Sequence, residues 1–318
     1  MSQKIKAEDL LKKLYTPGAK VEDFADYFIV SEDEDAPFRL TITYNPDKVD
    51  LGVTDEERQR AALALPGFNA MVRLLRRGQF ELMLLGGYKG PILVAEGDSW
   101  FTFPRLDVIG ALNDTWAISH LAAAGDTLQQ MLAQDEYIDE VKRLKARLLL
   151  LSAGGNDALG GGDLQKHLRP FDPALTPAQH IKSSFTALID DAIRQFDQIF
   201  RRVARETPGV GIICHGYDLA IPTTGKWLGK PMKALGITDK KVQREIVAEM
   251  INRFALAMKR LADRYPHVTF LDNRGTVKDP DWHDELHPNP AGFRKVAAKF
   301  DAAIRQATGR SAGGPTPP

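Results

Sequence analysis

The sequence predicts an α/β fold built around a parallel β-sheet. Residues 92–95, 147–152 and 210–215 are apolar runs without the alternation of a half-exposed strand, which is typical of strands covered on both faces. Segments with helical spacing of apolar residues lie between these runs. Because parallel neighbours need crossover connections, this alternation of strands and helices favours a parallel sheet.

Two further strands and three helices complete the predicted pattern. Residues 116–123 and 268–271 are the second and the fifth strand candidates. Residues 185–203 and 242–261 repeat apolar side chains at helical spacing on one face, and residues 291–307 predict a closing helix. The chain from residue 91 onward therefore reads as five strands joined mainly by helices.

The first 88 residues differ from this pattern and predict a small α+β accessory region. Residues 7–15 predict a short helix, and residues 38–44 alternate apolar and polar side chains like a half-exposed strand. Thr54 and Glu57 form a capping-box pattern before a second helical stretch, which we expect to break near Pro66-Gly67 and which continues through residues 70–77. The role of the region stays open.

Glycines in residues 86–90 predict a boundary after the accessory region. We therefore divide the chain into an N-terminal accessory region at 1–88 and a main domain at 89–308. Residues 309–318 are small and rich in proline and glycine, which predicts a disordered tail.

Composition narrows the classes of partner. The chain has 318 residues, with 42 lysines and arginines against 42 aspartates and glutamates, which argues against nucleic acid or an anionic membrane as a bulk electrostatic partner. Its single cysteine, Cys214, permits no intrachain disulfide and fits a reducing compartment. No apolar run reaches the ~18 residues of a membrane span, and residues 1–11 lack a signal-peptide core. We expect a cytoplasmic protein of open oligomeric state.

Polar and glycine residues follow the strand candidates. Gly97-Asp98-Ser99 comes after the first strand, Gly125-Asp126-Thr127 after the second and Gly154-Gly155-Asn156-Asp157 after the third. A fourth cluster, Asp281 to His287, lies beyond the fifth strand. Because open α/β sheets bind ligands at the carboxyl ends of their strands, we expect these segments to share one site.

Together these residues could perform acyl transfer, which needs a nucleophile, a base, a group that orients the base and donors for the oxyanion. Ser99 can be the nucleophile and His287 the base. Asp284 can reach the other ring nitrogen of His287 if the segment forms one helical turn. The backbone N–H groups of Ser99 and Gly125 and the side-chain amide of Asn156 can then hold the oxyanion.

These four blocks resemble those of the SGNH (GDSL) hydrolase family, in the family's order and over residues 91 to about 307. The resemblance implies a flavodoxin-like three-layer α/β/α domain with strand order 2-1-3-4-5. It also implies hydrolysis of an ester or thioester through an acyl-serine, without metal or other cofactor, and the roles given above to Ser99, Gly125, Asn156, Asp284 and His287. The sequence departs from the family where bulky aromatics and a proline, Trp100 to Pro104, follow the serine, so the first helix and the acyl pocket beside it are not predicted.

The substrate pocket is expected to include Trp100, Phe101, His215, Tyr217 and Trp227. The segment 216–232 follows the fourth strand on the same side, where pocket walls are often built. With Phe103, these aromatic side chains could make an apolar acyl site or a platform for a sugar ring. The sequence leaves a lipid, carbohydrate or other small-molecule ester open as the substrate.

Several alternatives stay open at this point. The same site would serve a carbohydrate O-acetylesterase, a thioesterase, a lysophospholipase or an acyltransferase. Asp281, His283, Asp284 and His287 also resemble a metal cluster, which would make the protein a metal phosphoesterase. However, residues 91–100 contain no histidine ligand, and we expect no metal. The remaining alternative is a non-catalytic binding module.

Overall fold

The computed structural model describes residues 4–32, 40–50, 64–158 and 163–309 of the chain. Five parallel strands form a central sheet in the order β6-β5-β7-β8-β9. Their bounds are β5 Leu93–Gly97, β6 Ile118–His120, β7 Leu148–Ser152, β8 Gly211–His215 and β9 Val268–Leu271. In sequence order this is 2-1-3-4-5, so the predicted parallel sheet and its strand order are confirmed.

The second strand is shorter than the pattern predicted. Of residues 116–123, only Ile118–His120 pair with β5. Beyond His120, the N–H groups of Leu121 and Ala123 still donate hydrogen bonds to carbonyls of β5, at 2.8 and 2.9 Å. The chain therefore stays beside β5 after the regular ladder ends and delivers Gly125 to the carboxyl edge of the sheet.

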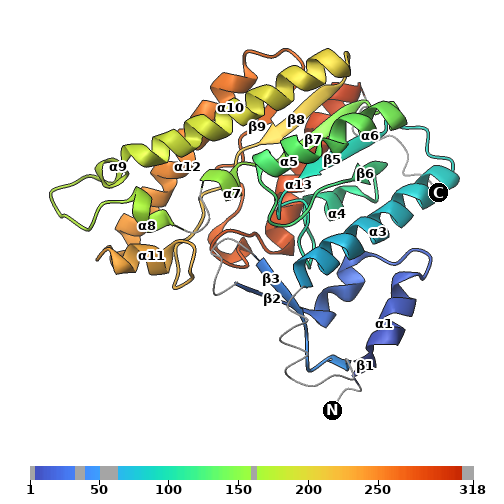
Figure 1. The fold of residues 1–318 in the computed structure, drawn as a ribbon, viewed down its shortest axis with the longest axis horizontal. Helices are drawn as coiled ribbons and strands as arrows, with labels where there is room; N and C mark the ends of the chain where they lie inside the picture. The colour runs from blue at the N-terminus through green and yellow to red at the C-terminus, as the bar shows by residue number, and fades with distance from the viewer. Residues whose placement is uncertain (1–3, 33–39, 51–63, 159–162, 310–318) are drawn as a thin grey trace.

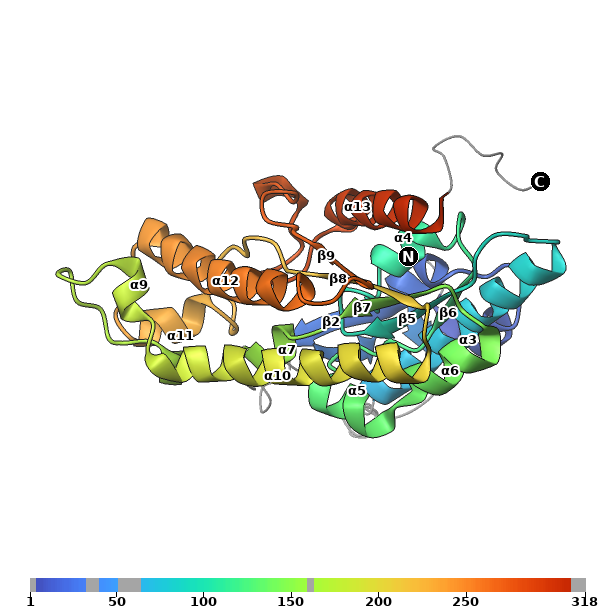
Figure 2. The ribbon, with the colours of Figure 1, turned by 90° about the horizontal axis from the view of Figure 1, so that it is seen from above.

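Helices cover both faces of the sheet, which makes three layers (Figures 1 and 2). One face carries α5 Leu128–Gln134, α6 Glu136–Leu144, α7 Gly155–Ala158 and α10 Ser183–Glu206. The helix α12 Lys240–Ala262 packs against α10 on this same face, and the opposite face carries α4 Val108–Leu112 and α13 Pro290–Thr308, which pack against each other. The buried strands β5 and β7 lie between these layers, which accounts for their unbroken apolar sequences.

The long helices begin at residues that cap them. The Asp239 side chain accepts hydrogen bonds from two N–H groups in the first turn of α12, and Asn289 does the same for α13. Pro290 follows at the first helical position, where its missing N–H costs nothing. These caps start both helices where the apolar periodicity begins, so the predicted helices 185–203, 242–261 and 291–307 are confirmed.

Three short helices extend the molecule beyond the carboxyl edge of the sheet. They are α8 Leu164–His167, α9 Pro177–His180 and α11 Gly229–Ala234. Figure 1 shows them at the left of the view, where α10 and α12 also project past the strands. The 3-10 helix η3, Asp279–Asp281, precedes the last cluster of candidate site residues. Helices therefore flank the carboxyl edge of the sheet on several sides.

The N-terminal region adds two small two-stranded sheets and helices. Its elements are β1 Ile5–Lys6, α1 Ala7–Leu14, η1 Val21–Tyr27, β2 Phe28–Glu32, β3 Leu40–Tyr44, β4 Val49–Asp50 and α3 Ala64–Leu85. The helix expected at 7–15 and the strand expected at 38–44 correspond to α1 and β3. Thr54 and Glu57 lie outside the described residues, and α3 continues through Pro66-Gly67 without a break.

Apolar packing is continuous from the N-terminal region into the main domain. Val72 and Leu75 of α3 belong to the same buried cluster as Leu93 and Leu149 of the sheet. Asn69 of α3 also exchanges hydrogen bonds with the backbone of Ala124, at 3.0 and 3.2 Å. The division of the chain at residue 88 stays a prediction, but α3 packs as part of the sheet's covering layer (Figure 2). Among the helices of the described residues, none is long and apolar enough to cross a bilayer.

Candidate active site

Ser99 lies in a tight turn immediately after β5. The N–H groups of Phe101 and Thr102 both donate to the Asp98 carbonyl, which bends the chain around the serine. At Gly97 a Cβ would lie 2.8 Å from the Ser152 carbonyl, so the residue before this turn must be glycine to let β5 and β7 approach. The turn therefore follows directly from the Gly97-Asp98-Ser99 sequence.

Ser99, His287 and Asp284 form one hydrogen-bonded chain. The Ser99 Oγ lies 2.9 Å from His287 Nε2, and the two side chains come from opposite ends of the domain sequence. His287 Nδ1 lies 2.9 and 3.0 Å from the two carboxylate oxygens of Asp284. Ser99 is 8% exposed and His287 4% exposed. The structure thus brings the three predicted side chains together and shields Ser99 and His287 from most of the solvent.

The segment that carries Asp284 and His287 is a turn rather than the helical turn we expected. Asp284 Oδ1 accepts hydrogen bonds from the N–H groups of Leu286 and His287, at 2.8 and 2.7 Å. An aspartate that caps its own turn in this way competes with helix formation. The three-residue offset still lets the carboxylate reach Nδ1, so the geometric expectation holds while its helical basis was wrong.

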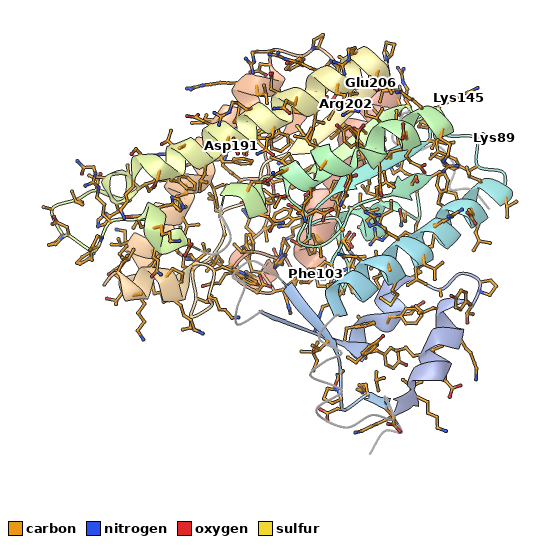
Figure 3. The ribbon with its side chains drawn as sticks, in the orientation of Figure 1. Lys89, Phe103, Lys145, Asp191, Arg202 and Glu206 are labelled. Carbon is orange, nitrogen blue, oxygen red and sulfur yellow. The ribbon has the colours of Figure 1, made fainter. Side chains whose placement is uncertain are left out.

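The surroundings of Asp284 favour its ionised form. Burial opposes ionisation, but the charge and hydrogen bond of His287 and the two backbone N–H groups outweigh it and hold the pKa of Asp284 below its usual value. Phe103, labelled in Figure 3, stacks on the His287 ring: the centres of the two rings lie 4.8 Å apart, and their planes differ by 21°. Neighbouring groups therefore favour the charged form of Asp284, and the Phe103 ring packs along the plane of the imidazole.

Gly125 and Asn156 line the same cavity as Ser99. Gly125 has φ +89°, a left-handed conformation that side chains rarely adopt, so the backbone can present its N–H here without strain only with glycine. The Asn156 amide donates to the Asp126 carbonyl at 2.8 Å. Because an amide NH₂ has two N–H groups, this bond orients the side chain and leaves a second donor. Both predicted oxyanion donors thus line the cavity that Ser99 lines.

A sequence comparison assigns this site to a family. The model of the GDSL-like lipase/acylhydrolase family matches residues 86–295. The chain belongs to this family, that of the SGNH hydrolases. It is therefore an esterase- or lipase-type hydrolase that acts on ester bonds. The N-terminal region up to residue 85, including α3, precedes the matched part.

Several solved structures resemble this SGNH hydrolase. An extracellular lipase from Streptomyces rimosus is 17% identical, with a TM-score of 0.45, covering 67% of this chain and 100% of that chain. The esterase EstA from Pseudoalteromonas is 13% identical, with a TM-score of 0.41, covering 68% and 97%. A carbohydrate esterase of family 3 from Talaromyces cellulolyticus is 13% identical, with a TM-score of 0.40, covering 70% and 100%. No curated protein sequence matches the chain significantly.

The cavity of the hydrolase is apolar away from the catalytic groups. It encloses about 910 Å³, including its open mouth. Its walls beyond the polar groups come mainly from α10, α12 and the loop before α11. These apolar lining residues are Ala158, Phe185, Ala220, Trp227, Leu228, Val247, Met250, Ile251, Phe254 and Leu286. The lining of the cavity thus combines Ser99 and His287 with a mainly apolar wall.

Three of the five predicted pocket residues line this cavity, namely Trp100, Tyr217 and Trp227. Phe101 and His215, the other two, are not among its lining residues. Phe101 is fully buried behind the turn, 5.5 Å from the Phe300 ring. His215 is also buried, where its Nε2 bonds the Ser152 hydroxyl at 2.8 Å. Both side chains point into the layer under the nucleophile turn and support it.

A buried network lies under the Ser99 turn. Asp98 accepts hydrogen bonds from the hydroxyls of Ser152, at 2.7 Å, and Tyr217. The Tyr217 oxygen also accepts from the Gly155 N–H at 3.0 Å, which links the Ser99 turn to the Asn156 turn. Burial lowers the pKa of His215, so it enters this network as a neutral ring. Tyr217 therefore supports the site as well as lining it.

The turn after Ser99 also differs from a direct strand-to-helix turn. No helix begins until Val108, five residues after Phe103, and α4 has only one turn. The aromatic segment fills this space: the Trp100 indole donates to the Leu286 carbonyl at 3.1 Å. The sequence departure at 100–104 thus supports the Asp284–His287 segment, and Phe103 stacks on His287 instead of lining the cavity.

His283, named above in the metal-cluster alternative, lies outside the hydrogen-bonded chain of Ser99, His287 and Asp284. Its ring is 5.6 Å from that of Phe103, and burial lowers the pKa of its imidazole. Within the parts of the chain that the structure describes, no group of three or more His, Cys, Asp or Glu side chains is arranged to hold a metal ion.

Sequence reasoning missed two contributions to the site. Val247 and Ile251 belong to α12, whose apolar face looks like ordinary helix packing until the cavity beside it is known. Glu285, between Asp284 and Leu286, is 1% exposed although glutamate is usually solvated. The sequence around Glu285 could not reveal its role. A buried carboxylate needs hydrogen-bond donors, but the backbone N–H groups that donate to Glu285 lie about sixty residues away in the sequence.

Proposed function

We propose that this SGNH hydrolase is a serine carboxylesterase whose substrates carry an apolar acyl chain. The observation that carries the proposal is the Ser99–His287–Asp284 chain of hydrogen bonds, whose serine and histidine line a mainly apolar cavity. A base 2.9 Å from a hydroxyl, itself oriented by a carboxylate, is the arrangement that activates a serine.

In the proposed reaction, Ser99 Oγ attacks the acyl carbon while His287 Nε2 takes its proton. The negative charge that develops on the carbonyl oxygen is held by the N–H groups of Ser99 and Gly125 and the amide of Asn156. His287 then protonates the leaving alcohol, and acyl-Ser99 remains. A water molecule, deprotonated by His287, hydrolyses this ester and restores the serine. Asp284 keeps the imidazole in the productive tautomer throughout.

The cavity walls support an acyl chain over a sugar ring. A sugar needs hydrogen-bonding side chains around its hydroxyls, whereas the walls here are contributed mainly by Phe, Trp, Leu, Val, Ile and Met. Each methylene buried against such walls favours binding by about 0.8 kcal/mol. This argues against a carbohydrate O-acetylesterase. A thioesterase, a lysophospholipase and an acyltransferase would present the same acyl group, and the alcohol side stays open.

The test is hydrolysis of p-nitrophenyl esters from acetate to decanoate by the wild type and by Ser99→Ala, with and without EDTA. We expect Ser99→Ala to lose at least about 10³-fold in kcat, and wild-type kcat/KM to rise from acetate to a chain of intermediate length. A fluorophosphonate should label the wild type at Ser99, which peptide mass spectrometry would locate.

The control is Ser184→Ala, an exposed serine of α10, which should keep wild-type rates. Activity that survives in Ser99→Ala but disappears with EDTA would overturn the mechanism and favour the metal phosphoesterase. A wild type that prefers acetate over every longer ester would overturn the proposed substrate class alone.

A further inference from the structure

Glu285 has an unusual position for a glutamate in a catalytic segment. It lies between Asp284 and His287 and is 1% exposed. Its carboxylate accepts hydrogen bonds from the backbone N–H groups of Thr223 at 2.6 Å, Leu228 at 2.8 Å and Gly229 at 2.9 Å. A buried carboxylate is costly unless it is paired in this way, so these bonds hold the 223–229 segment against Glu285.

The segment is shaped to enclose this carboxylate. A Cβ at Gly225 would lie 2.6 Å from the carboxyl carbon of Glu285. A Cβ at Gly229 would lie 2.0 Å from the Thr223 carbonyl oxygen and 3.0 Å from Glu285 Oε1. Because only glycine permits this close approach, the 223–229 segment and Glu285 fit as one unit.

The same segment carries one wall of the cavity. Trp227 and Leu228 are 2% and 1% exposed and line the cavity beside His287. The Trp227 ring lies 5.6 Å from the His287 ring, edge to face. On the outer side the Lys240 ammonium bonds the Thr223 carbonyl at 2.7 Å. The Glu285 carboxylate is thus the inner attachment of a wall that contacts the catalytic histidine.

We propose that Glu285 is a positioning residue that sets acyl-chain specificity. It acts through Trp227 and Leu228: by binding the backbone around them, it places their side chains where the acyl chain of the substrate would lie. The inference rests on the proposed function, because it concerns the acyl cavity of that esterase. Glu285 takes no part in the proton path, since Asp284 already bonds Nδ1 of His287.

The first test is Glu285→Gln, measured as kcat and KM separately on p-nitrophenyl acetate and octanoate. The amide NH₂ of glutamine would face backbone N–H groups that need an acceptor, which releases part of the segment. We expect kcat/KM for octanoate to fall at least ten times more than kcat/KM for acetate, chiefly through a higher KM. Glu245→Gln, on the exposed side of α12, is the matched control and should match the wild type on both esters.

A second variant avoids the catalytic segment. Gly225→Ala places a methyl group against the Glu285 carboxylate and should shift chain-length preference in the same direction. A double-mutant cycle with Trp227→Ala then asks whether Glu285 acts through this wall. When Trp227 is already alanine, Glu285→Gln should lower log(kcat/KM) for octanoate by at most half of the decrease that it causes in the wild-type background.

Equal losses on both esters in folded Glu285→Gln and Gly225→Ala, or full additivity with Trp227→Ala, would overturn the inference. If the near-UV circular dichroism spectrum shows that Glu285→Gln does not fold, the test rests on Gly225→Ala, judged by the same comparison of kcat/KM for octanoate and acetate. Failure of the proposed function looks different, because the wild type would then lack Ser99-dependent ester hydrolysis altogether.

Discussion

Asn156 shows how single side chains in this site are prepared before substrate binds. Its amide is oriented by the Asp126 carbonyl at 2.8 Å, and it stands in the first turn of α7 next to Gly155. Gly155 in turn donates its N–H to Tyr217, whose hydroxyl also binds Asp98. An amide donor that is already oriented loses little freedom when an oxyanion forms, which is the property that the proposed role of Asn156 requires.

We predict that Asn156→Ala lowers kcat on a p-nitrophenyl ester about 10²- to 10³-fold with little change in KM, the effect of losing one oxyanion donor. Steady-state kinetics on the preferred chain length would measure this. Asn113→Ala, at the end of α4, is the control and should keep wild-type kcat. A rate for Asn156→Ala within twofold of the wild type would remove Asn156 from the oxyanion hole.

At the scale of elements, α3 supports the turn that follows the nucleophile. The Arg76 guanidinium of α3 bonds Asp107 at 2.6 Å, and both side chains are fully buried. Asp107 also accepts the Phe103 N–H at 3.0 Å and caps α4 through the Gly110 N–H. Burial raises the pKa of Asp107, while the charge of Arg76 opposes this rise. The helix before the family match thus helps place the ring that stacks on His287.

Removing one partner of this buried pair leaves the other charge uncompensated. We therefore predict that Arg76→Met lowers the free energy of unfolding by about 3–5 kcal/mol, measured by urea denaturation. Arg77→Met is a matched control, because Arg77 is exposed on the same helix and pairs with Glu81 at 2.8 Å, so its loss should cost less than about 1 kcal/mol.

The double variant Arg76→Met with Asp107→Asn should recover part of the lost stability, because it removes the unpaired charge. Equal destabilisation by Arg76→Met and Arg77→Met would show that the buried pair does not hold α3 in place.

The whole molecule carries a buried acid behind its catalytic edge. Glu96, near the end of β5, is 2% exposed, and burial together with the nearby charge of Asp126 raises its pKa to about 8. Burial likewise raises the pKa of Asp126 to about 6, despite Arg73 nearby. In the unfolded chain a glutamate titrates near 4.5. The folded protein therefore holds the Glu96 proton more tightly than the unfolded chain does, and this contribution to stability is present at low pH and lost as pH rises toward 8.

We predict that Glu96→Gln gains stability relative to the wild type as pH rises from 5 to 8, by roughly 3 kcal/mol at about 1.4 kcal/mol per pH unit. Parallel urea titrations at pH 5, 6.5 and 8 would measure the difference. Glu81→Gln, at an exposed glutamate of α3, is the control for replacing a surface carboxylate. A difference for Glu96→Gln that stays constant, or shrinks, over this range would contradict the prediction.

Much of this architecture could be derived from local patterns in the chain. The buried strands around Leu93 and Leu149, the long helices and the turns at Ser99 and Asn156 each follow from neighbouring residues alone, because strand burial, helical periodicity and turn chemistry act over a few positions. The short motif from Asp284 to His287 belongs to the same class. The order of these motifs was enough to bring Ser99, Asp284 and His287 together at one edge of a parallel sheet.

Other features depend on packing between distant segments. Each of these features joins residues that are far apart in the sequence. They are the stacking of Phe103 on His287, the buried pair of Arg76 and Asp107, the backbone segment that encloses Glu285, and the burial of Phe101 and His215. A local pattern specifies that a side chain is apolar or charged, but its partner is chosen by the fold. The shape of the cavity beside Ser99 also depends on the fold, because a helix face that packs in the core and a face that lines a cavity carry the same kinds of apolar residue.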